Sequence, residues 1–96
     1  MDIVVAYDIS TSTSAGVRRL ARVAAICEGY GIRVQKSVFE CQLDNTRFAR
    51  LITELQDAIE PTVDSVRCYR VAGPLDDART TLGQDRPWEL GTTWIV

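Results

Sequence analysis

The 96-residue sequence contains no histidine, only three cysteines and no long apolar run. Zinc sites and Cys–His nucleophilic centres need histidine or closely spaced cysteines, so both kinds of site are very poorly supported. Cys27, Cys41 and Cys68 are odd in number, widely spaced and set among apolar residues, which predicts buried free thiols. Any catalysis must therefore rest on carboxylates, hydroxyls, arginines or a bound hard cation.

No apolar stretch approaches the ~20 residues that a membrane-spanning helix requires, and the N-terminus lacks the basic start of a secretion signal. We therefore expect no membrane association and a cytoplasmic location. A content of 46% hydrophobic and 25% charged residues is ordinary for one small globular domain. Because a chain of this size buries a smaller fraction of its surface than a large domain does, association with a second subunit is a natural source of stability.

The formal net charge of −2 gives no sign of a nucleic-acid partner, but the charge is unevenly distributed. Residues 1–50 carry seven basic and five acidic groups, whereas residues 51–96 carry four basic and eight acidic groups. Phosphate binding depends more on local patches of basic residues than on the net charge of the whole chain. The sequence is therefore compatible with a locally basic surface on the N-terminal half.

The first ten residues predict a buried strand that delivers one carboxylate, Asp8, to its C-terminal end. The branched side chains of residues 3–6 fit a packed, pleated surface. A carboxylate at the end of such a strand is held by a rigid backbone, and catalytic and binding residues are often found at such positions. From the strand alone, Asp8 is either the cap of the following turn or part of a functional site.

A polar run at residues 10–14 precedes a helix that is expected to extend to about Tyr30. Its predicted buried stripe follows helical spacing and consists of Val17, Leu20, Ala21, Ala24 and Cys27. Another face carries Arg18, Arg19 and Arg22 near the strand exit. These arginines form either a solvated helix face or a contact for phosphate.

The remaining elements complete the pattern of an α+β, ferredoxin-like βαββαβ fold with an antiparallel sheet. Apolar residues change phase between 32–34 and 39–43, so we predict two strands, at about 32–35 and 37–43. A second helix, capped by Asp44 or Asn45, ends before Pro61, and a last strand covers about 65–71. The helices are expected to cover one sheet face, and the apolar strands predict that a second subunit covers the other.

We divide the chain into a ferredoxin-like domain, residues 1–71, and a C-terminal extension, residues 72–96. The extension is rich in turn-forming residues until 91, whereas residues 92–96 favour a short strand. A free apolar strand at a chain end is costly. We expect it to add to a sheet edge, that of the partner subunit in a homodimer.

Three segments, residues 4–10, 29–41 and 64–69, resemble the CRISPR-associated protein two family in order and spacing. The middle segment, Gly-Tyr-Gly-Ile-Arg-Val-Gln-Lys-Ser-Val-Phe-Glu-Cys, is the most specific of the three. The resemblance covers roughly residues 1–71 and does not extend to residues 72–91. Many members carry Lys and Arg soon after the Asp-Ile-Ser segment, whereas here residues 11–16 are uncharged and the first arginine is Arg18.

The resemblance implies a homodimeric CRISPR adaptation protein that bridges two integrase dimers on captured duplex DNA during spacer acquisition. It also implies endonuclease activity on single-stranded RNA or double-stranded DNA, with Asp8 as the catalytic residue and Mg²⁺ ligand. Two copies of Asp8 across the dimer axis would share one ion. A scaffold role is favoured over turnover, since one carboxylate per subunit is a sparse active site.

Secondary roles are expected for residues near the strand exit and the hairpin. Arg18, Arg19 and Arg22 would contact nucleic acid, while Tyr7, Ser10 and Ser12 would offer hydrogen bonds. Ser37 and Phe39 are expected near the dimer contact. Two alternatives remain: a ferredoxin-like regulatory or ligand-binding module without a nucleic-acid role, because the fold hosts many functions, and a toxin-type ribonuclease.

Overall fold

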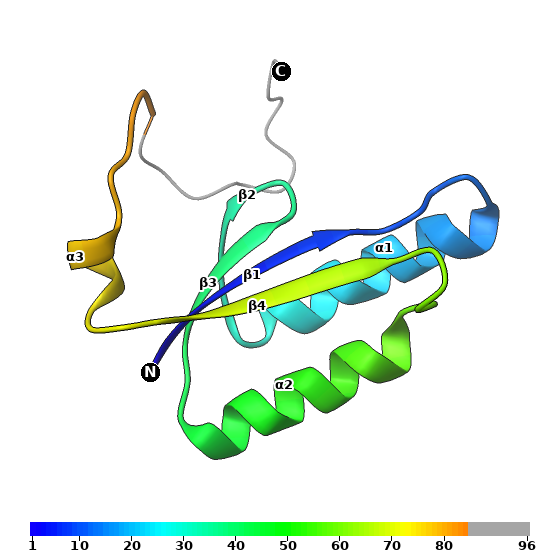
Figure 1. Ribbon diagram of the computed structural model, residues 1–96. Coiled ribbons are helices and arrows are strands. Elements are labelled where there is room, and N and C mark those ends of the chain that lie inside the picture. The colour runs from blue at the N-terminus through cyan, green and yellow to red at the C-terminus, as the bar shows by residue number, and fades with distance from the viewer. Residues whose placement is uncertain (85–96) are drawn as a thin grey trace.

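The computed structural model describes residues 1–84, which form a four-stranded antiparallel sheet with two long helices on one face (Figure 1). The order along the chain confirms the predicted ferredoxin-like fold. The elements are β1 (Asp2–Asp8), α1 (Ser14–Glu28), β2 (Gly31–Gln35), β3 (Val38–Gln42), α2 (Asn45–Ala58), β4 (Ser65–Val71) and the short α3 (Leu75–Ala78). The predicted strand at residues 92–96 lies outside the described residues.

Strand β1 occupies the centre of the sheet, whose spatial order is β2-β3-β1-β4. It pairs with β3 on one side and with β4 on the other, so its backbone is held along its whole length. Its side chains alternate between buried and partly exposed, as one covered and one uncovered face require. The core between sheet and helices is centred on Ile3, Val5, Val23, Phe39 and Leu51.

Both long helices begin at polar caps within the regions that the sequence indicates. The Thr13 hydroxyl accepts a hydrogen bond from the Gly16 amide at 3.1 Å. The Asp44 carboxylate accepts one from the Arg47 amide at 2.8 Å, so Asp44 rather than Asn45 is the cap of α2. Each cap satisfies a backbone donor that the helix itself leaves unpaired.

The predicted buried stripe of α1 is partly wrong. Val17 is 54% exposed and Ala21 is also exposed, whereas Gly16, Val23 and Cys27 are buried. The apolar part of the α1 surface is wider than the part that the sheet can cover. The sheet packs against the side of the helix that includes Val23. An apolar strip centred on Val17, Leu20, Ala21 and Ala24 is therefore not fully covered by the sheet.

The phase change between β2 and β3 is confirmed and has a structural reason. Phe39 and Cys41 point to the helix-covered face and are buried. Ile32, which pairs with Glu40, points to the opposite face and is 59% exposed. The pairing slips between Arg33 and Gln35, as at a β-bulge. Each face of this hairpin thus has its own apolar residues.

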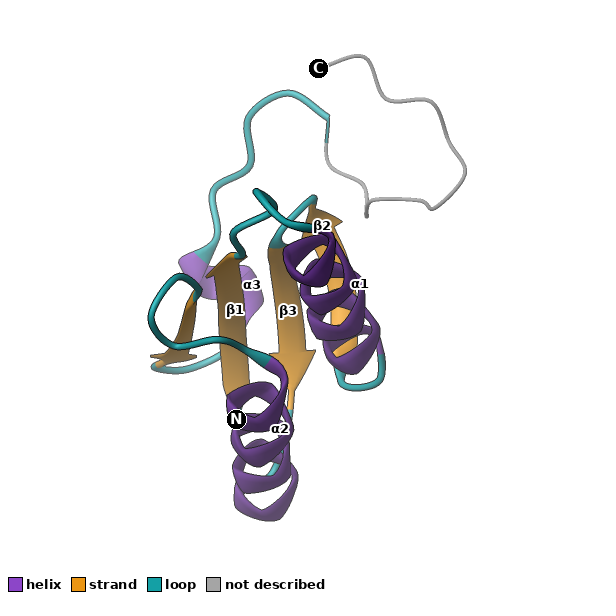
Figure 2. Ribbon diagram, turned by 90° about the vertical axis from the view of Figure 1, so that its right-hand side faces the viewer, coloured by secondary structure: helices purple, strands orange, loops and turns teal. Residues whose placement is uncertain are grey.

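The first part of the extension folds back onto the sheet instead of leaving it. The backbone N–H of Leu75, at the start of α3, donates to the Asp2 carboxylate at 2.7 Å. Arg79 donates two hydrogen bonds to Glu40, at 2.6 and 3.1 Å, and one to Asp76 at 2.9 Å. Figure 2 shows α3 on the side of the sheet opposite α1 and α2. Within residues 1–84, no helix is long and apolar enough to cross a membrane.

Candidate functional site

Asp8 is the last residue of β1, opposite Ser65 of β4. Its neighbours Ile3, Val5 and Tyr7 are buried under the helices, so by alternation Asp8 belongs to the other face. Asp8 is exposed, while its backbone is fixed by the ladder with β4. The carboxylate is therefore held by a rigid central strand and is open to solvent.

The face that α1 and α2 leave open carries a group of apolar side chains beside the polar residues Asp2, Glu40 and Arg67. By strand alternation and register it includes Val4, Ala6, Ile32, Val34, Val38, Tyr69 and Val71. Most are only half-buried, and Ile32 and Tyr69 are about half exposed or more, at 59% and 49%. A contiguous apolar surface with a carboxylate at its border is typical of an interaction face.

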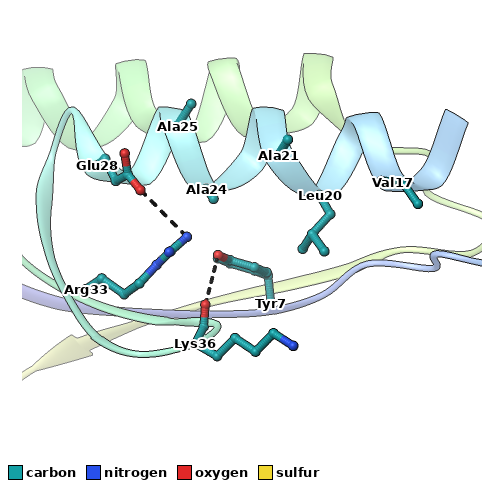
Figure 3. A pocket seen from close by; sticks show the side chains of 9 residues that line it. All are labelled: Tyr7, Val17, Leu20, Ala21, Ala24, Ala25, Glu28, Arg33 and Lys36. Carbon is teal, nitrogen blue, oxygen red and sulfur yellow. Dashed lines mark hydrogen bonds and ion pairs between the residues drawn. The ribbon is translucent and has the colours of Figure 1, made fainter. Parts of the chain in front are cut away.

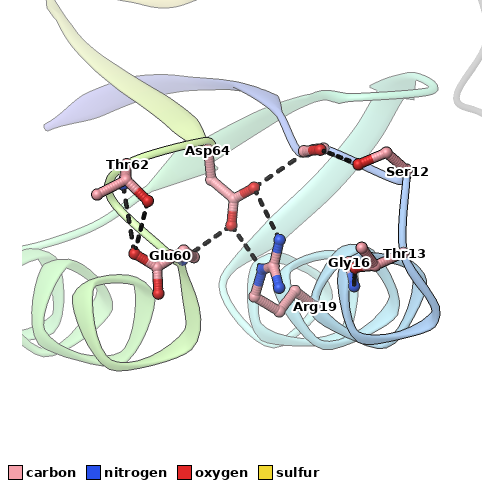
Figure 4. A network of polar contacts seen from close by, with 8 residues as sticks. Ser12, Thr13, Gly16, Arg19, Glu60, Thr62 and Asp64 are labelled. Atoms are coloured by element: carbon pink, nitrogen blue, oxygen red, sulfur yellow. Dashed lines mark hydrogen bonds and ion pairs between the residues drawn. The ribbon is translucent and has the colours of Figure 1, made fainter.

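The loop after Asp8 is fixed by contacts at several points (Figure 4). The Ser10 amide donates to Asp64 at 3.0 Å, and the hydroxyls of Ser10 and Ser12 lie 3.2 Å apart. Helix α1 packs so closely on this loop that a Cβ at Gly16 would overlap the Ser10 carbonyl oxygen. The exit from β1 therefore has little freedom to move.

Asp64 holds the ends of four elements together, although its sequence position suggested only a strand entry. Its buried carboxylate accepts hydrogen bonds from the Ser10 and Glu60 amides at 3.0 and 2.8 Å, and from Arg19 Nε at 2.8 Å. These bonds connect the β1 exit, α1, the α2 exit and the β4 entry. The Arg19 guanidinium, with the two amides, lowers the pKa of Asp64 to about 2 against the desolvation that burial imposes.

The structure separates the three arginines that the sequence grouped together. Arg19 is engaged with Asp64, which makes it part of the framework. Arg18 and Arg22 are exposed and form no ion pair with any residue of the described range 1–84. Of the trio, these two are the ones whose charge is available to a phosphate.

Two of the secondary candidates, Tyr7 and Phe39, belong to the core. Phe39 is completely buried on the helix side, so its side chain does not reach the open face, where we place the dimer contact. Tyr7 is 6% exposed and stacks on Phe39 with ring centroids 6.2 Å apart. Burial raises the pKa of Tyr7 above its usual value, and the nearby Arg33 offsets part of that effect.

Ser37 contributes through its backbone, since its carbonyl accepts a hydrogen bond from the Tyr7 amide at 3.1 Å. Arg67 is a candidate that sequence reasoning missed. It lies opposite Ala6 in the β1–β4 ladder, on the same face as Asp8, and its guanidinium donates to the Tyr69 hydroxyl at 3.1 Å. The alternation of β4 would have revealed this position only once its register with β1 was known.

The donor chemistry near Asp8 fits half of a magnesium site. Magnesium takes oxygen ligands, commonly one or two carboxylates, and keeps several waters. Within residues 1–84, no group of three metal-ligating side chains comes together. At the end of β1, one chain thus offers the Asp8 carboxylate, and a second copy of Asp8 would supply the other.

A sequence model of the family described as "CRISPR associated protein Cas2" matches residues 1–76. The chain belongs to the Cas2 family. The matched range contains the whole sheet and both long helices, together with Asp8, Arg67 and Asp64, and it ends within α3.

Individual Cas2 proteins agree with this membership in sequence and in structure. The chain is 38% identical over all 96 residues, the full length of both proteins, to the "CRISPR-associated endoribonuclease Cas2" of Chlorobaculum tepidum. It is 45% identical over 71 residues, 74% of each chain, to the "CRISPR-associated endonuclease Cas2" of Halalkalibacterium halodurans. The Streptococcus pyogenes Cas2 crystal structure superposes with a TM-score of 0.78, at 40% identity, covering 86% of this chain and all of that one.

Proposed function

We propose that the protein acts as a homodimer in CRISPR adaptation, bridging integrase dimers on captured duplex DNA, and carries a Mg²⁺-dependent endonuclease site. The observation that carries this proposal is the position of Asp8, exposed at the border of an apolar sheet face. Membership of the Cas2 family supports it, as do the names of the relatives, which describe an endoribonuclease and an endonuclease.

The apolar open face is the surface we assign to the second subunit. Pairing two such faces would cover Val4, Ala6 and Val38 and bring two strand ends, each with its Asp8, to one interface. A self-complementary contact of this kind follows a two-fold axis, and the two copies of Asp8 meet when this axis passes beside the ends of the two β1 strands. The terminal strand expected at residues 92–96 would add to a sheet edge of the partner.

The proposed function gives the carboxylate of Asp8 and the arginines near the β1 exit separate roles. Asp8 would hold Mg²⁺ through its carboxylate, and Arg18, Arg22 and Arg67 would hold phosphates of the nucleic acid. When bound, the ion would supply charge stabilisation at a phosphodiester and lower the pKa of a ligated water. Arg19 and Asp64 position the loop at Ser10 and take no part in the chemistry.

A cleavage assay with an Asp8 variant tests the catalytic part. The purified protein is incubated with Mg²⁺ and either single-stranded RNA or duplex DNA, beside Asp8→Asn and a control containing a chelator. We expect cleavage only by the wild type with Mg²⁺. Equal cleavage by wild type and Asp8→Asn would contradict the assignment of Asp8.

The scaffold part is tested separately by spacer acquisition in cells. Acquisition that survives Asp8→Asn, together with co-purification of the integrase, would show that bridging does not require cleavage. Loss of integrase binding in a wild-type protein that still cleaves nucleic acid would count against the scaffold role.

A further inference from the structure

An apolar groove runs along α1 on the helix side of the molecule, away from Asp8 and the open sheet face (Figure 3). It has a volume of about 530 Å³, and its apolar lining consists of Tyr7, Val17, Leu20, Ala21, Ala24 and Ala25. Val17 is 54% exposed, and Ala21 and Ala25 are exposed as well. A continuous apolar strip on an outward helix face, unlike scattered apolar residues, indicates an interaction surface.

The groove has two cations at its edge, and one of them, Arg33, is only partly satisfied by its neighbours. The Arg33 guanidinium lies 5.1 Å from the centroid of the buried Phe39 ring, and its side chain is only 12% exposed. Its ion pair with Glu28 is long, at 3.7 Å, which is beyond the range of a good hydrogen bond. Among residues 1–84, Arg33 Nε is buried and has no hydrogen-bond partner, which is a costly arrangement for a charged donor.

Lys36, from the turn between β2 and β3, adds a second positive charge beside the groove. It forms no ion pair with any residue between 1 and 84. Glu28, the one acidic group lining the groove in this described part of the chain, pairs with Arg33, so the two cations leave a net charge of +1 at the groove. An occupant with a carboxylate would therefore meet favourable charge from Lys36 and the Arg33 guanidinium.

The dimensions and lining favour a segment of a protein over other ligands. From Val17 to Glu28 the helix rises about 16 Å, which matches about five extended residues or a short helix. The outward alanines leave the groove open on one side, whereas small molecules usually bind in enclosed pockets. A nucleic-acid backbone would need cations along its whole path, and most of this lining is apolar.

We propose that this groove docks a short segment of a protein partner that presents large apolar side chains and a nearby carboxylate. The apolar side chains lie over Ala21 and Ala24, and the carboxylate pairs with Arg33 and Lys36. The proposal is independent of Asp8. It is also compatible with a dimer through the open sheet face, since the groove is on the opposite side of the sheet.

The test uses defined peptides with the full-length protein. Fluorescent hexapeptides that combine Leu, Phe or Trp with Asp or Glu are compared with matched peptides in which Lys replaces each acid. Binding is measured by anisotropy for the wild type, for Ala21→Arg, which fills the groove from an exposed position, and for Arg33→Met, which keeps the stem and removes the charge. Ala49→Arg, at an exposed alanine of α2, is the matched control.

We expect acidic apolar peptides to bind at least tenfold more tightly than their lysine counterparts. Ala21→Arg and Arg33→Met should each weaken this binding by about tenfold or more, with Ala49→Arg unchanged and circular dichroism confirming that all variants are folded. Equal binding of acidic and lysine peptides, or no effect of Ala21→Arg, would overturn the proposal.

Three other outcomes would assign the groove to a different occupant and would likewise overturn it. Tighter binding of a peptide of residues 85–96 than of any other probe would assign the groove to the chain's own C-terminal region. Loss of self-association in Ala21→Arg would assign it to a second copy. Competition by duplex DNA that persists in Arg33→Met would assign it to nucleic acid.

Discussion

Replacing Asp64 by Asn should destabilise the fold and loosen the loop beside Asp8. The variant keeps the shape of the side chain but removes its charge, and its NH₂ group must face Arg19 Nε or a backbone amide that also donates. The pKa of Asp64 falls from an ordinary 3.8 to about 2 in the folded state. At about 1.4 kcal/mol per unit, the charged carboxylate contributes about 2 kcal/mol to stability at neutral pH.

The pH dependence of this contribution has a definite sign. Because the folded state has the lower pKa, the unfolded chain binds more protons between the two values. The stabilisation is therefore complete above about pH 4 and is lost as the pH falls through about 2. The difference in free energy of unfolding between wild type and Asp64→Asn should shrink over this range.

Urea denaturation followed by circular dichroism at several pH values between 7 and 2 measures this difference. Asp57→Asn, at an exposed position of α2, is the control and should change stability little at any pH. A loss below about 1 kcal/mol at pH 7 would refute the assigned role of Asp64. A difference that stays constant down to pH 2 would refute its electrostatic origin.

Three further predictions concern close packing, the thiols and the extension. Gly16→Ala should destabilise the protein by about 2 kcal/mol in chemical denaturation, because its Cβ would overlap the Ser10 carbonyl oxygen. The control Gly29→Ala should have a much smaller effect, and equal effects of the two variants would contradict the close approach of α1 to Ser10. Burial raises the pKa of Cys27 to about 12 and that of Cys41 to about 11. Iodoacetamide at pH 8 should therefore label both thiols on the order of a hundredfold more slowly in the native protein than in urea, and rapid labelling of the native protein would contradict their burial. Arg79→Ala should speed amide hydrogen exchange at Leu75 without lowering the melting temperature of the sheet domain, and unchanged exchange would mean that the bonds to Glu40 and Asp76 do not hold α3.

The sequence was sufficient to predict the order of elements and most of their bounds, because its local signals agree with one another. The cap region before α2, the stop at Pro61 and the phase change between residues 34 and 39 each correspond to a feature of the structure. Such signals act within a few residues, where helix and strand periods are directly visible.

Features that depend on distant contacts could not be predicted in this way. The role of Asp64 arises from Ser10 and Arg19, which are 54 and 45 residues away along the chain. Periodicity shows that α1 has a wide apolar arc, but it does not show which side the sheet covers, so Val17 was misplaced and Val23 was missed. Helix α3 is only four residues long and depends on Asp2, at the other end of the described chain.

We propose that each chain holds half of a metal site, centred on Asp8. This can be measured by titrating the full-length protein with Mn²⁺, as a spectroscopic substitute for Mg²⁺, and following free Mn²⁺ by electron paramagnetic resonance. We predict about one ion bound per two chains, and none for Asp8→Asn. Binding of one ion per chain, or binding that Asp8→Asn leaves intact, would contradict the claim.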